Sequence, residues 1–97
     1  MRCGIYVAGV GIRRIRAAVR RGRYEFTLHA LEEMDEDEVS ESDVRSALLH
    51  GRVIAQLAGD QRGTRFAVRG IPRRSDRAIE VVCRFLPSGI LRIITVY

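Results

Sequence analysis

The chain has 97 residues, a length that predicts one domain over residues 1–97 with roughly 65% of its unfolded surface buried. Hydrophobic residues make up 46% of the chain, which excludes a disordered protein, and no apolar run approaches the roughly 18–20 residues of a transmembrane helix. The formal net charge is +5, and every basic residue is an arginine, whose planar guanidinium suits phosphate or carboxylate.

The first eleven residues are apolar and contain three glycines. They lack the small-residue cleavage site of a secretory signal, so we expect either a disordered extension or an extra strand. A helix is predicted over 12–21, because Ile12, Ile15 and Val19 recur at helical spacing and Gly22 ends the pattern. Its other face is rich in arginine, and three of these side chains are candidates for holding an RNA backbone by charge: Arg13, Arg16 and Arg20.

A second helix is predicted after the short segment 24–27. Thr27 is suited to be its N-cap, and Leu28, Leu31 and Met34 are expected on its apolar side. The acidic run that follows, 35–38, has neither the ligand spacing nor the glycine of a calcium loop, so we interpret it as a solvated face.

A third helix has the clearest start in the sequence. Ser40 and Asp43 have the spacing of a capping pair, while Val39 and Val44 occupy the positions of a hydrophobic staple. Gly51 is expected to end this helix.

After Gly51 the hydrophobic period changes from about 3.6 to 2, which indicates strands. We expect them at 53–57, 64–70, 78–86 and 90–97, with a turn at 59–63 and a hairpin turn at 87–89. The last two segments are apolar on both faces, as in central strands that helices cover on one side. The predicted fold class is therefore α+β, with two or three N-terminal helices packed on an antiparallel sheet of about four strands.

Charge is strongly segregated along the chain. Residues 1–24 carry +7, residues 25–45 carry −8 and residues 46–97 carry +6. An anionic partner such as a nucleic acid fits the two basic segments, whereas the acidic block either shields them within the molecule or faces something basic.

Four strings in this sequence carry a family resemblance. They are Y-E-F-T-L-H-A-L-E-E-M at 24–34, V-S-E-S-D-V at 39–44, G-R-V-I at 51–54 and L-R-I-I-T-V-Y at 91–97. Over about residues 12–97 the chain resembles the bacterial domain-of-unknown-function family 4258, small proteins grouped with the RelE-like and MqsR-like toxins. The F-T-x-H-A and I-T-V-Y strings are the most specific.

The resemblance implies a RelE/barnase-like toxin fold, in which helices pack on a curved antiparallel sheet. It also implies the toxin of a type II toxin–antitoxin pair, acting as a metal-independent endoribonuclease of the mRNA-interferase kind, with a small zinc-finger or DNA-binding antitoxin as partner. The chain departs from the family at 35–38, where relatives carry basic residues and a glycine, and at Tyr97, beyond which relatives continue. The alternative is a non-catalytic or degenerate module of the same fold that binds RNA or protein.

Metal-free RNA cleavage needs a base for the ribose 2′-hydroxyl, cations for the phosphorane and an acid for the leaving 5′-oxygen. His29 is the candidate acid or base, because imidazole is the side chain that exchanges protons near neutral pH; the alternative is a local hydrogen bond at the helix start. Arg65 is the candidate cation. The Tyr97 hydroxyl either binds the substrate or caps the core.

Further RNA-binding candidates are expected on the exposed side of the sheet: Arg69, Arg84, Arg92 and Thr95. Arg65 and Arg69 share one face of their strand, and Glu80 is expected to pair with one of these cations. Thr95 and Tyr97 are expected on the same face of the last strand as Leu91 and Ile93.

No P-loop, zinc-binding motif or dinucleotide loop is present, so we expect no cofactor and no metal. Cys3 and Cys83 lack C-x-x-C spacing and are expected to be reduced, buried thiols of a cytoplasmic protein. The expected partners are RNA and the small antitoxin, a homodimer is left open, and no membrane partner is expected.

Overall fold

The computed structural model describes residues 10–57 and 63–97. In chain order they form α1 (Val10–Arg20), β1 (Tyr24–Phe26), α2 (Leu28–Glu36), α3 (Glu41–His50), β2 (Arg52–Leu57), β3 (Arg65–Gly70), β4 (Ile79–Phe85) and β5 (Leu91–Val96). The predicted α+β class is confirmed. Val10 and Gly11, expected in the N-terminal extension, instead belong to α1, while residues 1–9 and most of the expected turn at 59–63 lie outside the described part.

The five strands form one open sheet in the order β1-β5-β4-β3-β2. The pairs among β2, β3, β4 and β5 are antiparallel, but β1 runs parallel to β5. The expected purely antiparallel sheet of about four strands is therefore wrong in both respects. β1 is only three residues long, too short for a period of two to show, and its partner β5 lies at the other end of the chain.

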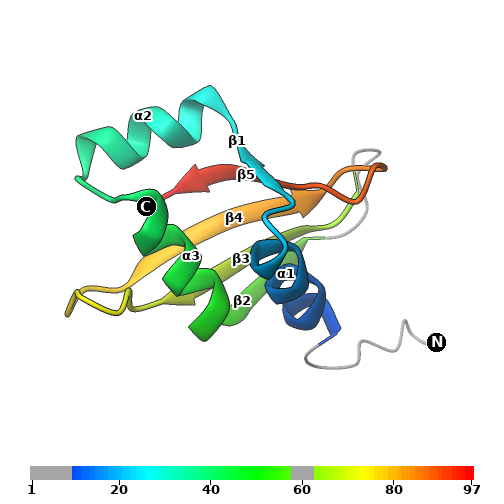
Figure 1. Cartoon of the computed structure of the whole chain (residues 1–97), viewed down its shortest axis with the longest axis horizontal. Coiled ribbons are helices and arrows are strands. Elements are labelled where there is room, and N and C mark those ends of the chain that lie inside the picture. The colour runs from blue at the N-terminus through cyan, green and yellow to red at the C-terminus, as the bar shows by residue number, and fades with distance from the viewer. Residues whose placement is uncertain (1–9, 58–62) are drawn as a thin grey trace.

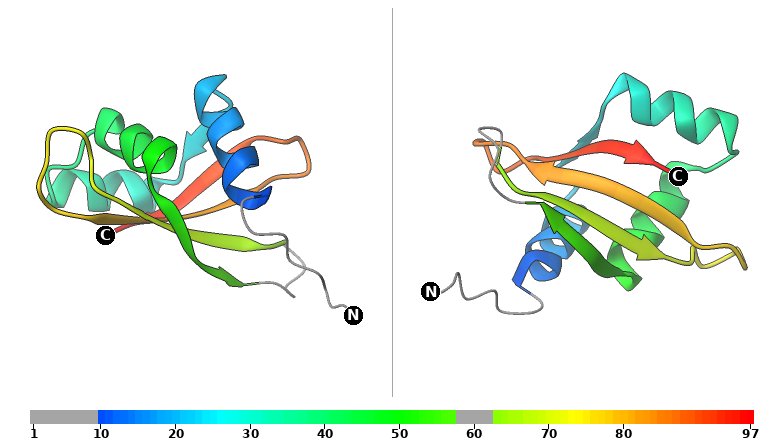
Figure 2. Two further views of the ribbon diagram at one scale, coloured as in Figure 1. Left: turned by 90° about the horizontal axis from the view of Figure 1, so that it is seen from below. Right: turned by 180° about the vertical axis from the view of Figure 1, so that it is seen from behind.

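The helices lie on one side of the sheet (Figures 1 and 2). α1 and α3 cross the covered face, and α2 runs along the edge where β5 extends beyond β1. The side chains of β3 and β4 alternate between this core and the opposite face, which no described helix covers. The largest fully buried side chains are Ile15, Val19, Val44, Leu48, Val68, Val81, Cys83, Leu91, Ile93 and Val96.

The start of α3 confirms the predicted capping pair. The Ser40 N–H donates to the Asp43 carboxylate at 3.0 Å, and the Asp43 N–H donates to the Ser40 hydroxyl at 3.1 Å. Two backbone donors that the helix cannot satisfy are thereby paired. Val39 and Val44, the expected staple, are both buried, so this local signal fixes both the start of α3 and its orientation on the sheet.

The apolar side of α2 differs from the expectation. Leu28 is 73% exposed and Leu31 is 46% exposed, whereas Met34 faces the core as expected, together with Ala30. The hydrogen bonds that join each end of α2 to β5, described below, fix its rotation and turn Ala30 inward. A small residue at this position lets the helix approach the sheet closely, which the hydrophobic pattern alone does not reveal.

A close backbone approach explains Gly51, where α3 passes into β2. A Cβ atom there would lie 2.4 Å from the Arg69 carbonyl oxygen and 2.5 Å from that of Ala47. Both obstacles are backbone, so we expect Gly51→Ala to destabilise the fold by about 3 kcal/mol in urea unfolding. Gly22→Ala, which meets no atom within 4 Å but has a φ of 71°, should cost about 1 kcal/mol. Equal losses in the two variants would contradict this packing explanation.

Candidate nucleic-acid interface

The uncovered face of the sheet aligns three arginines in one row across its strands. Arg65 on β3 pairs in register with Arg84 on β4, which pairs with Arg92 on β5. Residues directly opposite one another in neighbouring strands point to the same face, with Cβ atoms about 5 Å apart. We call Arg65, Arg84 and Arg92 the arginine row. The structure thus brings together three of the predicted RNA-binding or catalytic residues.

The positive charge of the arginine row is only partly neutralised. The Arg92 guanidinium binds the Glu25 carboxylate of β1, with Nε and Nη2 each 2.8 Å from Oε2. Among the described residues, neither Arg65 nor Arg84 has a carboxylate within 4.0 Å. Like charges placed opposite each other in a sheet repel, so an anion bound here would relieve a cost already present in the fold.

Arg84, in the middle of the row, carries the most informative atom. Its Nε is buried and makes no hydrogen bond within the described structure, a property that it shares with the Arg16 Nε of α1. A buried donor without an acceptor costs about 1–3 kcal/mol, and such a donor in a native protein calls for a specific reason. Because this nitrogen is closed to solvent, a phosphate oxygen can accept its hydrogen bond only after the Arg84 side chain moves outward.

Next to the arginine row lies an uncharged row. It contains Ala67 of β3, Val82 of β4 and Thr95 of β5, which are paired in register. All three are half-buried. Because these side chains are short and uncharged, the row forms a shallow, weakly polar strip on which a base or ribose can lie.

A third row crosses the other end of the strands and is of mixed charge. Arg69 lies opposite Glu80, and the backbones of Glu80 and Tyr97 exchange hydrogen bonds of 2.9 and 3.3 Å. The predicted ion pair of Glu80 is not formed at 4.0 Å or less with any described arginine. Arg69 and Tyr97 are both exposed, so the cationic and aromatic groups expected here are accessible.

A bulge in β5 corrects the predicted facing of the last residues. Cys83 pairs with Ile93 and Val82 pairs with Thr95, so Ile94 is an extra residue without a partner on β4. Thr95 therefore joins the uncovered face, whereas Leu91 and Ile93 are fully buried in the core. A strict alternation cannot foresee this, because one inserted residue exchanges the two faces from that point onward.

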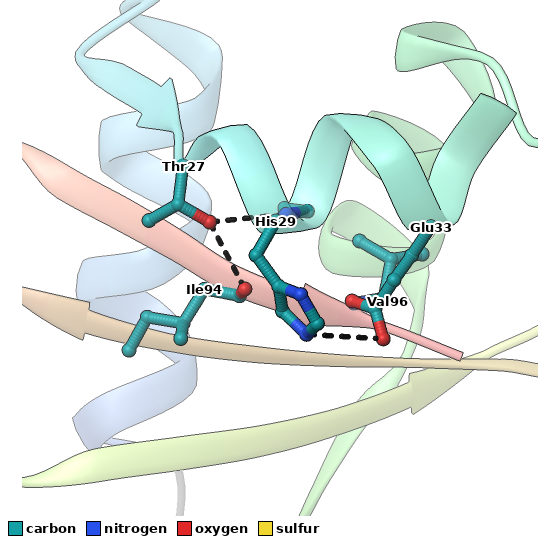
Figure 3. A network of polar contacts seen from close by, with 6 residues as sticks. Thr27, His29, Glu33, Ile94 and Val96 are labelled. Carbon is teal, nitrogen blue, oxygen red and sulfur yellow. Dashed lines mark hydrogen bonds and ion pairs between the residues drawn. The ribbon is translucent and has the colours of Figure 1, made fainter.

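The F-T-x-H-A string folds as the junction between β1 and α2. The Thr27 hydroxyl accepts a hydrogen bond from Ala30 N–H at 3.1 Å, as predicted for an N-cap, and donates to the Ile94 carbonyl at 3.0 Å. Farther along α2, the Glu33 carboxylate accepts the Val96 N–H at 2.9 Å. Side chains of α2 thus satisfy the edge of β5 where β1 no longer pairs with it (Figure 3).

These edge contacts give a prediction for Thr27. Thr27→Val keeps the shape but removes both hydrogen bonds, so we expect a loss of about 1–2 kcal/mol in the free energy of unfolding. Thr27→Ser keeps the hydroxyl and should lose less than half as much. Urea denaturation of both variants measures the difference, and equal losses would show that the hydroxyl makes no net contribution.

His29 lies beside this edge, on the first turn of α2. Its side chain is 65% exposed, and Nε2 lies 3.4 Å from the second carboxylate oxygen of Glu33, four residues later. Figure 3 shows the imidazole and Glu33 side by side, pointing from α2 across β5. Because Glu33 is itself fixed by the Val96 N–H, it can orient the imidazole ring. Sequence reasoning missed Glu33, although the i, i+4 spacing was a signal.

The three predicted catalytic residues do not all come together. Arg92 lies near the start of β5, where it pairs with Glu25, and the rest of the arginine row lies at the same end of the sheet. Glu33 contacts Val96, which is at the end of β5. Four residues of a strand span about 13 Å, so His29 and Tyr97 lie at one end of the uncovered face and Arg65 lies at the other. Arg65 is therefore not a neighbour of His29.

The arginines of α1 belong to the opposite side of the molecule. α1 packs on the covered face, and Arg13 and Arg20 are exposed there. Arg16 is used internally, because its Nη2 donates to the Gly51 carbonyl at 2.9 Å. These three candidates therefore do not join the arginine row on the uncovered face.

A separate polar cluster ties β1 to the helices and was not foreseen. The Tyr24 hydroxyl donates to the Glu41 carboxylate, and Arg45 donates to the Tyr24 oxygen and to the Val19 carbonyl, each at 3.0 Å. Burial raises the pKa of Tyr24, and the hydrogen bond to Glu41 raises it further, while Arg45 acts in the opposite direction. This cluster joins the short β1 to α1 and α3, and Glu25 of the same strand pairs with Arg92.

The described residues offer few other kinds of chemistry. They contain no group of three or more His, Cys, Asp or Glu side chains arranged to hold a metal ion. Cys83 is fully buried as expected, and burial raises the pKa of its thiol to about 12, which keeps it unreactive. Cys3 lies outside the described residues. In the same part of the chain, no helix combines the length and apolar character of a membrane span.

Comparison with known proteins identifies one family. Searches of curated proteins and of solved structures found no match. A family model, the domain of unknown function DUF4258, matches residues 26–97, which include α2, α3 and β2 to β5. The chain therefore belongs to the DUF4258 family.

Proposed function

We propose that this protein binds RNA on the uncovered face of its sheet and cleaves it as a toxin-type endoribonuclease that needs no metal ion. The observation that carries the binding part is the arginine row, with two guanidinium groups lacking a carboxylate and one buried Nε lacking an acceptor among the described residues. Regularly spaced arginines beside a weakly polar strip suit a single strand, whose phosphates and bases need different surfaces.

The cleavage step uses the other end of this face. The RNA strand follows the arginine row across β3, β4 and β5 and then turns along β5 toward His29, a further distance of about two nucleotides. His29, oriented by Glu33, removes the ribose 2′-hydroxyl proton, and the 2′-oxygen attacks the adjacent phosphorus. The bond to the 5′-oxygen breaks, the Tyr97 hydroxyl donates a proton to that oxygen, and a 2′,3′-cyclic phosphate remains.

We also propose a toxin fold and a partner protein for this chain. The family resemblance, together with helices packed on one face of a sheet, supports a RelE-like/MqsR-like toxin fold in a cytoplasmic type II pair. The exposed arginines of α1 lie on the opposite side from the proposed RNA surface. They can therefore receive an acidic segment of a small antitoxin while the sheet holds RNA.

A second candidate function has an observation of its own. His29 and the arginine row lie at opposite ends of β5. This separation favours a module that holds RNA without cleaving it, since a cleaved phosphate needs its acid, base and cations within a few ångströms.

One experiment separates the two functions. Purified protein is incubated with a 5′-labelled single-stranded RNA in buffer with excess EDTA, and both binding and product ends are measured. The proposal predicts salt-sensitive binding and fragments that end in 2′,3′-cyclic phosphate. Binding without fragments would establish the non-catalytic module, and absence of binding at low salt would remove both functions.

A further inference from the structure

A polar hollow lies on the other side of the molecule from the proposed RNA surface. It occupies about 560 Å³ between α3 and the loop that joins β3 to β4. The α3 wall contains Ser42, Ser46 and His50, and the loop wall contains Arg73 and Arg74. None of these residues takes part in the proposed RNA cleavage.

The two walls are joined by a specific contact. The Arg73 N–H donates to the Ser46 hydroxyl at 2.9 Å, which fixes the loop against the middle of α3. This bond places the side chains of Arg73 and Arg74 on the rim of a defined hollow rather than on a free loop. The site is therefore built by two elements far apart in sequence.

The charge of the hollow is positive. Its one carboxylate, on Asp43, already accepts the Ser40 N–H at 3.0 Å. Arg45 is also engaged, because it donates to the Val19 carbonyl and the Tyr24 hydroxyl. Arg73 and Arg74 have no carboxylate within 4.0 Å among the described residues, so their guanidinium groups are available to an anion.

An apolar side adjoins the cationic one. Leu49 lines the same hollow, and a neighbouring hollow of about 310 Å³ shares Ser46, His50 and Arg73 but adds Ile71, which is 57% exposed. Ligand sites in proteins commonly have volumes of about 300–1,000 Å³ and combine apolar walls with a few charged groups. The combination fits a phosphate group joined to a flat or apolar body.

From this geometry we propose that the hollow between α3 and the β3–β4 loop binds a phosphate monoester of nucleotide size. The phosphate lies between Arg73 and Arg74, with a hydrogen bond from the His50 ring, and the base lies toward Leu49 and Ile71. The same chemistry is presented by a free nucleotide and by the 5′-phosphate end of an RNA. This site is independent of the proposed cleavage on the uncovered face.

Calorimetric titration at low salt tests the proposal with adenosine monophosphate as probe and adenosine as control. We expect saturable binding of the monophosphate and no binding of adenosine. A nuclear magnetic resonance titration with the monophosphate should show chemical-shift changes at the Ser46 and His50 amides. Arg73→Gln combined with Arg74→Gln should weaken binding at least about tenfold, the effect of losing charged hydrogen bonds. Arg77→Gln, in the same loop but outside the hollow, should change it less than about twofold.

Competition identifies the natural source of the phosphate. If an RNA with a 5′-phosphate displaces the monophosphate and the same RNA with a 5′-hydroxyl does not, the ligand is an RNA end. If neither RNA displaces it, the ligand is a free nucleotide. Equal binding of adenosine, equal losses from Arg77→Gln and the double variant, or no saturable binding would overturn the proposal.

Discussion

His29→Ala is expected to lower the rate of RNA cleavage at least about 100-fold while changing RNA affinity less than about twofold. General acid–base catalysis by a positioned side chain typically contributes 100-fold to 10,000-fold to a rate. The imidazole is exposed and touches Glu33 rather than the core, so its removal creates no cavity. Single-turnover cleavage and equilibrium binding, measured on the same RNA, give the two quantities separately.

The control for this variant lies on the same helix. Glu32→Gln changes an exposed residue of α2 that makes no described polar contact, and it should leave the cleavage rate unchanged. Undiminished cleavage by His29→Ala would show that the imidazole is not the acid or base. A loss of affinity equal to the loss of rate would show instead that it serves in binding.

Replacing Arg65, Arg84 and Arg92 together with glutamine is expected to weaken RNA binding at least about 100-fold at low salt. Three lost phosphate contacts should also reduce the slope of log affinity against log salt by about 2, at roughly 0.7 per contact with a single strand. Glutamine keeps much of the side-chain length and removes the repulsion between neighbouring cations, which offsets the loss of the half-exposed Arg92–Glu25 ion pair, so the stability of the fold should change little. Binding titrations at four salt concentrations measure both effects.

A matched variant removes the same charge from the opposite side of the molecule. Arg13, Arg20 and Arg21 are exposed at or just after α1, and their replacement by glutamine should change RNA affinity less than about fivefold through long-range attraction alone. If this variant lost as much affinity as the row variant, RNA would bind the helical side, or net charge alone would govern binding.

Local signals in the sequence predicted the parts of the fold that depend on local chemistry. The caps at Thr27 and Ser40 were correct, because each needs only a side-chain oxygen and a backbone N–H three residues apart. The four longer strands were placed within two residues, since each is long enough for its alternation to show. β1 was missed as a strand because its pairing with β5 is a tertiary contact between distant parts of the chain.

The candidate surface was predictable in composition but not in geometry. That Arg65 and Arg69 share a face follows from the period of a strand. The alignment of Arg65, Arg84 and Arg92 depends on the register between strands, and the facing of Thr95 depends on the bulge at Ile94. Neither feature leaves a pattern in the sequence, and both decide where the cations lie relative to His29.

The most direct test of the central claim is a nuclear magnetic resonance titration with a short single-stranded RNA that carries a 5′-hydroxyl. If RNA binds the uncovered face, the largest shifts occur at the Arg84 Nε–H and at amides on this face of β3, β4 and β5. Shifts confined to α1 and α3, with the Arg84 Nε–H unchanged, would contradict it.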